Sequence, residues 1–471
     1  MRSTTRLGLF LALAATAPVH AAAVRGAPPA PPAQPAAPAP PGSPAPAPAI
    51  KVERFSLANG IRAIVVEAPG ATKQSMLMFL PQRLADDPAG KAQWSHLVEH
   101  LLLRSVVPEG FEIDGVRING ETRPMSQHLE TVGDPATLDR MADLHAAWLR
   151  SRDVADGVLE AEKANIEQEE STTAARGFTS KFAIAAWNQV VRQGQRDARV
   201  HGNVAGATRD DAEAWLRNVA PIGPGLLVAT IGPTSVAQAR ATLERTVGAA
   251  QAGAPPAALP PSQPRAVAPG ETIEASWDMP RRHVMLWWDV PAATLVDRVR
   301  SQVVGTMIHL QVSADPALRN PGVVALVSPF LPPVGPSAGA PFATLLVDVS
   351  LKPDDTVDSA TIVKAVRDAV TRLSAGIAGK DLEQQWRPKA LLPALSMPAP
   401  PFRESQRRAG GAAFGDLLET QWLLTNGIAE FEFGATRDEL AAAADAVDLA
   451  SVRAFVAKLA DEAPRVLVLK P

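Results

Sequence analysis

Three residues in one apolar run have the types and the spacing of a metal-dependent hydrolytic site. His96 and His100 are four residues apart, so a helix over residues 92–105 places both imidazoles on one face, one turn apart. Glu99 lies beside them, three residues after His96. Neutral imidazoles suit Zn²⁺, and a catalytic zinc lowers the pKa of a water that a neighbouring carboxylate can deprotonate. The pattern therefore predicts a zinc clamp with Glu99 as the base.

The order His-x-x-Glu-His is that of inverzincins, the reverse of the commoner His-Glu-x-x-His motif. The motif is short, so a chance pair of histidines on the solvent face of a helix is the alternative interpretation. A catalytic zinc takes three protein ligands, and the third must come from elsewhere in the chain. The acidic stretch 154–170 offers Glu162, Glu169 and Glu170, although a solvated helix face also explains such a stretch.

The elements around the motif are predicted to hold it on a rigid support. Asn59-Gly60 between two apolar runs is typical of a hairpin turn, because both residues tolerate positive φ. A buried strand then precedes the motif helix, which places the ligands directly behind a sheet. The elements predicted before residue 250 are a hairpin in 55–66, strands at 75–80, within 115–132 and at 225–232, and helices at 92–105, 135–149, 154–170, 212–219 and 236–247.

Length and composition narrow the classes of function. With 471 residues the chain has room for two or three domains, each with its own core. A formal net charge of −3 and a pI near 6.3 leave no basic excess to hold a polyanion, so no nucleic-acid partner is expected. The chain has no cysteine, which excludes a disulfide framework and is compatible with an oxidising compartment.

The N-terminus is typical of an export signal. Arg2 and Arg6 precede a mostly apolar run at 7–17 that is too short to remain as a membrane span, and residues 1–21 are predicted to be a signal peptide. The Pro/Ala-rich stretch 22–50 favours an extended, exposed tether. We therefore expect a periplasmic or secreted protein without a stable membrane span.

Four motifs in order resemble those of the M16 metallopeptidases, the family of pitrilysin, insulinase and the mitochondrial processing peptidase. They are Leu57-Ala58-Asn59-Gly60, His96-x-x-Glu99-His100, Asn119-x-x-Thr122, and Glu162 followed seven residues on by Glu169. The resemblance implies that Glu169 is the third zinc ligand and that Glu162 supports the site from behind. It also implies that the strand around Asn119 is an edge to which an extended peptide adds. Glu170 stays an alternative ligand, since the spacing from His100 to Glu169 is short for the family.

The second half of the chain repeats the order of elements without the metal motif. Residues 251–270 are rich in Pro and Ala and are predicted to link an N-terminal domain, 51–250, to a C-terminal domain, 271–471. The resemblance implies an α+β fold of two homologous domains, each a mainly antiparallel sheet packed by helices, which form a clam-like chamber. The elements predicted here are strands at 283–290, 344–351 and 465–469, and helices at 295–312, 359–375 and 449–459.

One family feature is incomplete in this chain. The family's second domain often carries an arginine and, seven residues on, a tyrosine that reach the bound peptide or the developing oxyanion. Arg319 matches the arginine, and is expected to bind substrate, but Leu326 stands at the tyrosine position and the chain has no tyrosine. A missing oxyanion donor costs about 3 kcal/mol of transition-state stabilisation. We therefore expect a homodimer, or a heterodimer in which this chain is the zinc-bearing subunit and its partner supplies the pair, as in some bacterial M16B-type proteins.

Three functions are compatible with these features of the sequence. The first is an exported zinc endopeptidase in which one Zn²⁺ per chain and Glu99 hydrolyse peptides or small unfolded proteins. The second is a non-catalytic M16 homologue that binds peptides or scaffolds a partner, which the missing tyrosine favours. The third, an exported carrier protein with a chance motif, requires that the two-domain resemblance be wrong.

Overall fold

The computed structural model describes most of the chain after residue 49, and Ala47–Pro471 forms one compact unit. The predicted signal peptide, nearly all of the predicted tether, most of the predicted linker, and Arg319 lie outside the described residues. The described residues are 50–82, 84, 87, 90–123, 126–151, 153–155, 157–175, 180–199, 203–219, 222–251, 266–315, 318, 324–331, 342–352, 355–376, 388–392, 395 and 412–471. Below, the first half means the described residues 50–251 and the second half those from 266 to 471.

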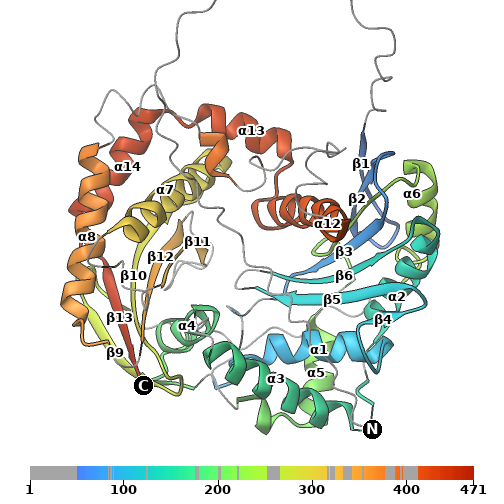
Figure 1. The fold of residues 1–471 in the computed structure, drawn as a ribbon, viewed down its shortest axis with the longest axis horizontal. Helices are drawn as coiled ribbons and strands as arrows, with labels where there is room; N and C mark the ends of the chain where they lie inside the picture. Colours follow the sequence, from blue (N-terminus) through green and yellow to red (C-terminus); the bar gives the residue numbers. More distant parts are fainter. Residues whose placement is uncertain are drawn as a thin grey trace, which may run out of the picture. The chain divides into compact units, whose positions relative to one another are not determined.

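A seven-stranded sheet is the centre of the first half (Figure 1). Its order is β1-β2-β8-β3-β6-β5-β4, and all neighbouring pairs are antiparallel except β2 and β8. The predicted Asn-Gly turn joins the first two strands, with Gly60 at φ 86°. The strands are β1 (Lys51–Ser56), β2 (Arg62–Glu67), β3 (Gln74–Leu80), β4 (Glu112–Ile113), β5 (Val116–Thr122), β6 (Gln127–Gly133) and β8 (Leu227–Gly232).

Helices cover one face of this sheet with a continuous apolar core. Every helix predicted for this part of the chain is present, with ends shifted by a few residues. The core includes Met78 of β3 and Leu101 of the motif helix, both almost fully buried. The helices on this face are α1 (Trp94–Val106), α2 (Leu138–Arg150), α3 (Val158–Ala175), α5 (Arg209–Val219) and α6 (Val236–Arg245).

The second half is built on a six-stranded sheet with the order β11-β12-β10-β13-β9-β7. Its core contains Trp288, and Trp287 is buried on the other face of the sheet. The strands are β7 (Asp197–Ala198), β9 (Thr272–Trp277), β10 (Arg282–Pro291), β11 (Val324–Leu331), β12 (Phe342–Leu351) and β13 (Arg465–Lys470). The helices on one face are α7 (Leu295–Ala314), α8 (Ser359–Gly376), α13 (Arg437–Ala446) and α14 (Leu449–Asp461).

The two sheets share one strand order. The run β2-β8-β3-β6-β5 of the first corresponds to β9-β13-β10-β12-β11 of the second, and in each the first two strands of the run are parallel. In each half a long helix follows the third strand of the run, α1 after β3 and α7 after β10. The predicted α+β class, with mainly antiparallel sheets packed by helices, is confirmed.

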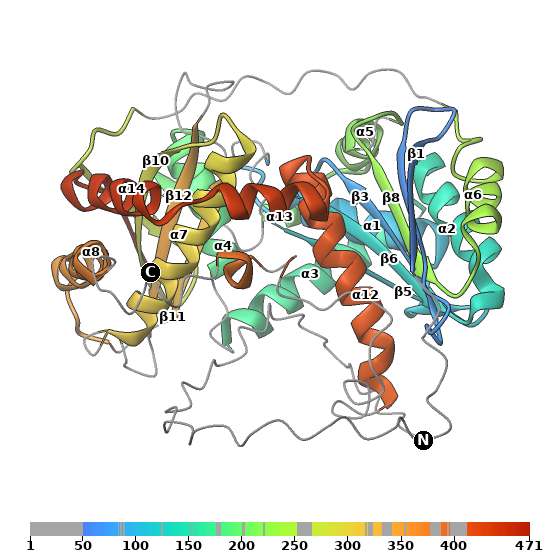
Figure 2. The ribbon, with the colours of Figure 1, turned by 90° about the horizontal axis from the view of Figure 1, so that it is seen from above.

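Each sheet is completed by a helix from the other half of the chain. Helix α12 (Ala412–Ile428) lies on the second face of the first sheet (Figure 2). Its Trp422 and Leu423 share a buried apolar cluster with Phe79 of β3. Phe182 and Trp187 of α4 (Ser180–Trp187) pack against the second sheet. The short strand β7, also from the first half, pairs with β9. The two halves therefore share their cores, an exchange that the sequence did not predict.

The approach of α12 to β3 is close and specific. The hydroxyl oxygens of Ser75 and Thr420 are 2.7 Å apart in a buried hydrogen bond. Gly427 lies against Phe79, and a Cβ on that glycine would be 2.4 Å from the phenyl ring. A larger residue at position 427 would push the helix off the sheet, so this glycine allows the close packing.

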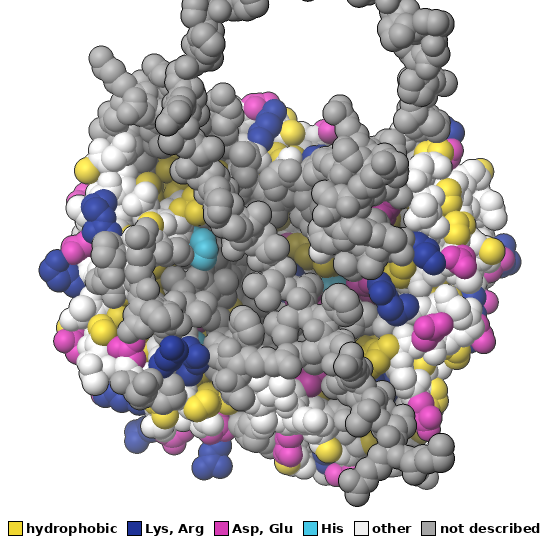
Figure 3. Space-filling view, in the orientation of Figure 1, with side chains coloured by type: hydrophobic (Ala, Val, Ile, Leu, Met, Phe, Trp, Pro, Cys, Tyr) yellow, Lys and Arg dark blue, Asp and Glu magenta, His cyan; other side chains and the backbone are white. Residues whose placement is uncertain are grey.

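On the face shown in Figure 3, Lys and Arg side chains alternate with Asp and Glu. Among the helices that the structure describes, none combines the length and the apolar character needed to cross a bilayer.

Candidate metal centre

The motif helix α1 is held in place by its apolar face and by a cap at its N-terminus. Leu97, Val98 and Leu101 are buried in the core under the sheet. The Asp87 carboxylate accepts hydrogen bonds from the backbone N–H groups of Gln93, at 2.8 Å, and Ser95, at 2.9 Å. An acceptor at this end satisfies backbone donors that have no partner within the helix. The histidine positions are therefore fixed by both packing and capping.

The structure brings His96, His100 and Glu169 together. One ligand atom from each lies within 4.8 Å of the others, the only such group of three or more among the described residues. Oε2 of Glu169 is 3.5 Å from Nε2 of His96 and 3.9 Å from Nε2 of His100. Two ligands at ordinary zinc distances are roughly 3.3–3.6 Å apart around a tetrahedral ion. Two imidazole nitrogens and a carboxylate oxygen are a donor set that suits Zn²⁺, and small side-chain adjustments would bring all three atoms to this spacing.

Glu162 lies behind the second histidine. Its Oε2 is 2.8 Å from Nδ1 of His100, and its Oε1 accepts a 3.0 Å hydrogen bond from Nε of Arg104. Burial acts to raise the pKa of the Glu162 carboxyl, but hydrogen bonds from His100 and Asn165 and the charge of Arg104 outweigh it and lower this pKa. A carboxylate can only accept, so Nδ1 of His100 carries the proton and its Nε2 is left to face Glu169.

The charges around His100 favour its protonated form when no metal is bound. Burial disfavours the imidazolium, but the hydrogen bond with Glu162 and the nearby carboxylates Glu99 and Glu169 outweigh it and raise the pKa of His100. The same negative potential favours a metal cation. A metal at this position competes with a proton for His100.

Glu99 is buried beside the histidines and is held by a chain of hydrogen bonds from the sheet. The Thr122 hydroxyl donates to Oε2 of Glu99 at 2.8 Å. Nε2 of Gln127 donates to that hydroxyl oxygen and to the backbone oxygen of Ser95, both at 2.8 Å. Gly120 makes room on the same face, because a Cβ there would lie 2.7 Å from Oε1 of Glu99. This support fixes the carboxylate that would act as the base.

The remaining predicted site residues lie apart from the three ligands. Asn119 is exposed on β5 and pairs with Glu130 of β6. Arg319 is outside the described residues. Glu170, the alternative third ligand, is fully buried and is not in the group of three.

Sequence reasoning missed four residues around the site: Asp87, Arg104, Gly120 and Gln127. Thr122 was part of a quoted motif, but no function was assigned to it. The spacing of Thr122 and Gly120 could have indicated its function. Residues two apart on a strand share a face of the sheet, and here that face meets α1.

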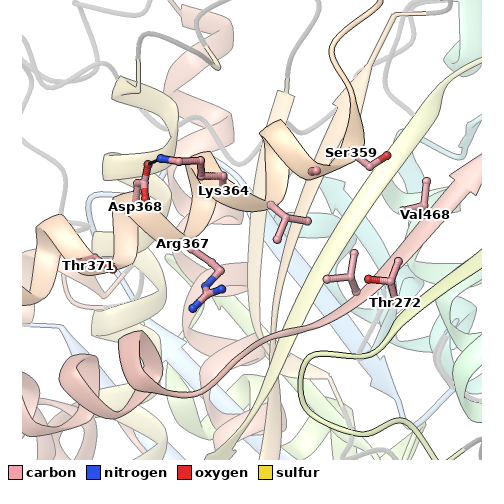
Figure 4. Close-up of a pocket in the computed structure, with 10 residues that line it drawn as sticks. Thr272, Ser359, Lys364, Arg367, Asp368, Thr371 and Val468 are labelled. Carbon is pink, nitrogen blue, oxygen red and sulfur yellow. Dashed lines mark hydrogen bonds and ion pairs between the residues drawn. The ribbon is translucent and has the colours of Figure 1, made fainter.

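A separate cavity of about 480 Å³ lies in the second half, between α8 and strands β9 and β13 (Figure 4). Lys364, Arg367 and Asp368 are among its lining residues, and Lys364 forms a 2.6 Å ion pair with Asp368. None of the lining residues belongs to the group around His96, so this cavity is not part of the candidate metal centre.

Solved structures with this fold are peptidases and related domains. A protease from Helicobacter pylori matches with a TM-score of 0.63 at 13% identity, over 89% of this chain and 99% of that one. A peptidase M16 inactive domain from Pseudomonas fluorescens matches at 0.59 and 14%, over 89% and 98%. The periplasmic protease PqqL from Escherichia coli matches at 0.58 and 14%, over 93% of this chain and 49% of that one. By sequence, no family model and no curated protein matches this chain. The chain therefore has the fold of M16-type peptidases, which includes proteases and at least one domain described as inactive.

Proposed function

We propose that this protein is an exported M16-type zinc endopeptidase that hydrolyses peptides or small unfolded proteins. The observation that carries the proposal is the meeting of His96, His100 and Glu169, which come from two helices and have their ligand atoms within 4.8 Å of one another. The M16-type fold supports the same proposal, because solved structures with this fold include proteases.

The three ligands would hold one Zn²⁺, His96 and His100 through Nε2 and Glu169 through a carboxylate oxygen. When bound, zinc supplies a Lewis acid and lowers the pKa of a water to about 7. Glu162 holds the proton of His100 on Nδ1, and this hydrogen bond orients the ring. Mutation of such a supporting carboxylate typically lowers metal affinity by about 10- to 100-fold.

Glu99 accepts the proton of the attacking water and passes it to the departing amine. The Thr122 hydroxyl holds Oε2 of this carboxylate. A general base must lie within hydrogen-bond reach of the proton it takes, and a fixed carboxylate satisfies this requirement with little reorganisation. Thr122 and Gln127 therefore position the base and do not take part in proton transfer.

The substrate would bind as an added strand on β5. Within the described residues, β4 pairs only with Val116 and Arg117, and Ile118 donates to the backbone oxygen of Phe111. The outer edge from Asn119 to Thr122 therefore has no strand partner there. Addition of a peptide strand to such an edge uses backbone hydrogen bonds and tolerates many sequences. Asn119 would align the peptide backbone, and Arg319 would contact it from the second half across a chamber.

The proposal extends to export and assembly. We propose a periplasmic or secreted location. We also propose that the chain consists of a signal peptide (1–21), a tether (22–50), two domains (51–250 and 271–471) and a linker between them (251–270). The absence of tyrosine from the sequence supports a pair of subunits in which another chain, or another copy, supplies the missing groups.

A non-catalytic homologue is the second candidate. The absent tyrosine favours it, and so does a structural neighbour described as an inactive M16 domain. In this case the edge of β5 would bind peptides without cleaving them.

The test is cleavage of a diverse quenched-peptide pool by the zinc-loaded chain from residue 22 onward. Glu99→Gln keeps the shape of the side chain but removes the base, so we expect cleavage by the wild type and a loss of about 1,000-fold in the variant. Equal cleavage by both would eliminate Glu99 as the base. If neither cleaves with zinc bound, alone or with a tyrosine-bearing M16 partner, the non-catalytic function is supported.

A further inference from the structure

Glu130 of β6 is a largely buried residue whose carboxyl group has no hydrogen-bond partner among the residues that the structure describes. Its side chain is 9% exposed, and no hydrogen bond or ion pair to it is found among the described residues. Two charges on the adjacent strand act on Glu130: that of Arg117, which has the larger effect, favours the carboxylate, and that of Glu121 disfavours it. A buried acid without a partner is costly, so such a group calls for an explanation.

The register of the strands places Glu130 on the face of the sheet that meets α12. Gly120 and Thr122 of β5 point to Glu99 and α1, so their neighbours Asn119 and Glu121 point to the opposite face. Glu130 is directly opposite Asn119, and residues opposite each other share a face. His128, opposite Glu121, is 5.9 Å from the ring of Phe79, which packs on α12.

This face is next to the open edge of β5. Asn119 is exposed, and the Glu121 side chain is 37% exposed and forms a 3.6 Å ion pair with Arg123. A peptide strand added at the edge would lie roughly 10 Å from β6, two strand spacings away. Every second side chain of that peptide would point to the face that carries Glu130. A long side chain that crosses Asn119 can reach a glutamate at this distance.

We propose that Asn119, Glu121 and Glu130 form a subsite that accepts a lysine or arginine side chain of the bound peptide. The inference rests on the proposed function to the extent that a peptide adds to β5. Asn119 and Glu121 line the entrance of the subsite, and Glu130 is the counter-charge at its base.

The chemistry of Glu130 fits a cationic side chain better than an apolar one. Burial raises the pKa of this carboxyl to about 7, so near neutral pH it is only partly ionised in the free protein. A cation beside it stabilises the carboxylate and provides the missing hydrogen bonds. An apolar side chain of the same length would leave the carboxyl buried without a partner. The subsite therefore predicts that a peptide with a cationic side chain binds more tightly than one with an apolar side chain of the same length.

Binding to the zinc-loaded full chain that carries Glu99→Gln tests the subsite without cleavage. The probes are fluorescent extended peptides of small polar residues with one lysine, scanned along the sequence, and the same peptides with norleucine in its place. At one position in the peptide we expect lysine to bind on the order of tenfold more tightly than norleucine. Glu130→Gln should reduce this preference to less than twofold, and Glu121→Gln should weaken it in part.

The matched control is Asp143→Asn, which removes one exposed carboxylate from α2 on the other side of the sheet. Asp143→Asn and Glu130→Gln change the net charge of the protein equally, so a general charge effect would appear in both. Because Asp143 lies away from the subsite, Asp143→Asn should leave the lysine preference unchanged. A lysine preference that survives Glu130→Gln would overturn the inference, as would equal binding of lysine and norleucine peptides or binding of neither. Should Glu130→Gln fail to fold, the effect of Glu121→Gln decides in the same way.

The outcomes separate this inference from the proposed function. A lysine preference in binding, together with no cleavage by the wild type, would support the subsite and refute hydrolysis. Cleavage by the wild type without any preference for lysine would support hydrolysis and refute the subsite.

Discussion

The two halves of the chain have the same order of five strands, but their central helices differ in chemistry. In the first half α1 buries His96 and Glu99, each 5% exposed. In the second half α7 occupies the equivalent place after the third strand and buries apolar side chains such as Val299 and Val303. The same architecture therefore holds a candidate metal site in one half and an ordinary core in the other. A few side chains, and not the fold, carry the chemistry.

The second half also contains a buried histidine–carboxylate pair. Nδ1 of His283 is 2.7 Å from Oδ1 of Asp348, and both side chains are fully buried. In the first half a chemically similar contact, between His100 of α1 and Glu162 of α3, is accompanied by His96 and Glu169. Among the described residues, the pair in the second half has no third ligand at metal-binding distance. A second histidine and a further carboxylate convert a structural pair into a candidate metal site.

The largest predicted difference between the halves concerns their buried acids. Asp348 pairs with His283, whereas Glu130 has no hydrogen bond or ion pair within the part of the chain that the structure describes. The pKa of Glu130 is raised to about 7 from 4.5, so the folded state holds a proton that the unfolded state releases between these values. Stability is therefore lost as the pH rises through this window. Relative to wild type, Glu130→Gln should gain up to about 3 kcal/mol in free energy of unfolding between pH 4.5 and pH 8. Urea unfolding at the two pH values measures this gain, and a constant difference would refute it.

The second prediction compares the two histidine–carboxylate pairs directly. Glu162→Gln should weaken zinc binding by about 10- to 100-fold, because the hydrogen bond that orients His100 becomes weaker. Asp348→Asn should leave zinc affinity unchanged, since His283 is not part of the site. Competition with a fluorescent zinc chelator measures both affinities. A similar loss of zinc affinity in the two variants would contradict the assignment of Glu162, and not Asp348, to the metal site.

The third prediction tests whether the sheet positions the base. Gly120→Ala introduces a Cβ 2.7 Å from Oε1 of Glu99 and should displace the carboxylate. We expect kcat for peptide cleavage to fall about tenfold with zinc content unchanged. Gly206→Ala is the matched control, because no atom lies within 4 Å of the position of its new Cβ. Unchanged kcat in Gly120→Ala would mean that Glu99 tolerates a shift.

The smallest predicted effect concerns the start of the motif helix. Gln93 has a left-handed φ of 70°, and both polar atoms of its buried side-chain amide have no hydrogen-bond partner among the described residues. Gln93→Gly should relieve both costs and raise the free energy of unfolding by about 1 kcal/mol, after the loss of packing. Gln93→Ala removes the amide but keeps the backbone strain, so thermal unfolding of the two variants separates these causes. A destabilised Gln93→Gly would show that packing of the side chain dominates.

The local elements of the fold were predictable because hydrophobic periodicity and turn residues are local signals. The motif helix and the Asn59-Gly60 turn are examples. The exchange of α4 and α12 was not predictable, because an apolar helix shows that it needs a sheet but not which sheet. In the site, the four-residue spacing of His96 and His100 was enough to predict that both side chains lie on one face of a helix. The roles of Gly120 and Gln127 were not predictable. Their contacts with Glu99 and its neighbours depend on the register between β5 and β6, which the sequence alone does not define.

The most direct test of the account is the zinc content of the purified chain from residue 22 onward, after dialysis against trace zinc. We expect close to one zinc per chain in the wild type, loss of this zinc in Glu169→Gln, and retention in Glu167→Gln, which removes the same charge two residues away on α3. Elemental analysis together with native mass spectrometry gives the stoichiometry. Wild-type protein without zinc, or full retention of zinc in Glu169→Gln, would contradict the proposed metal centre.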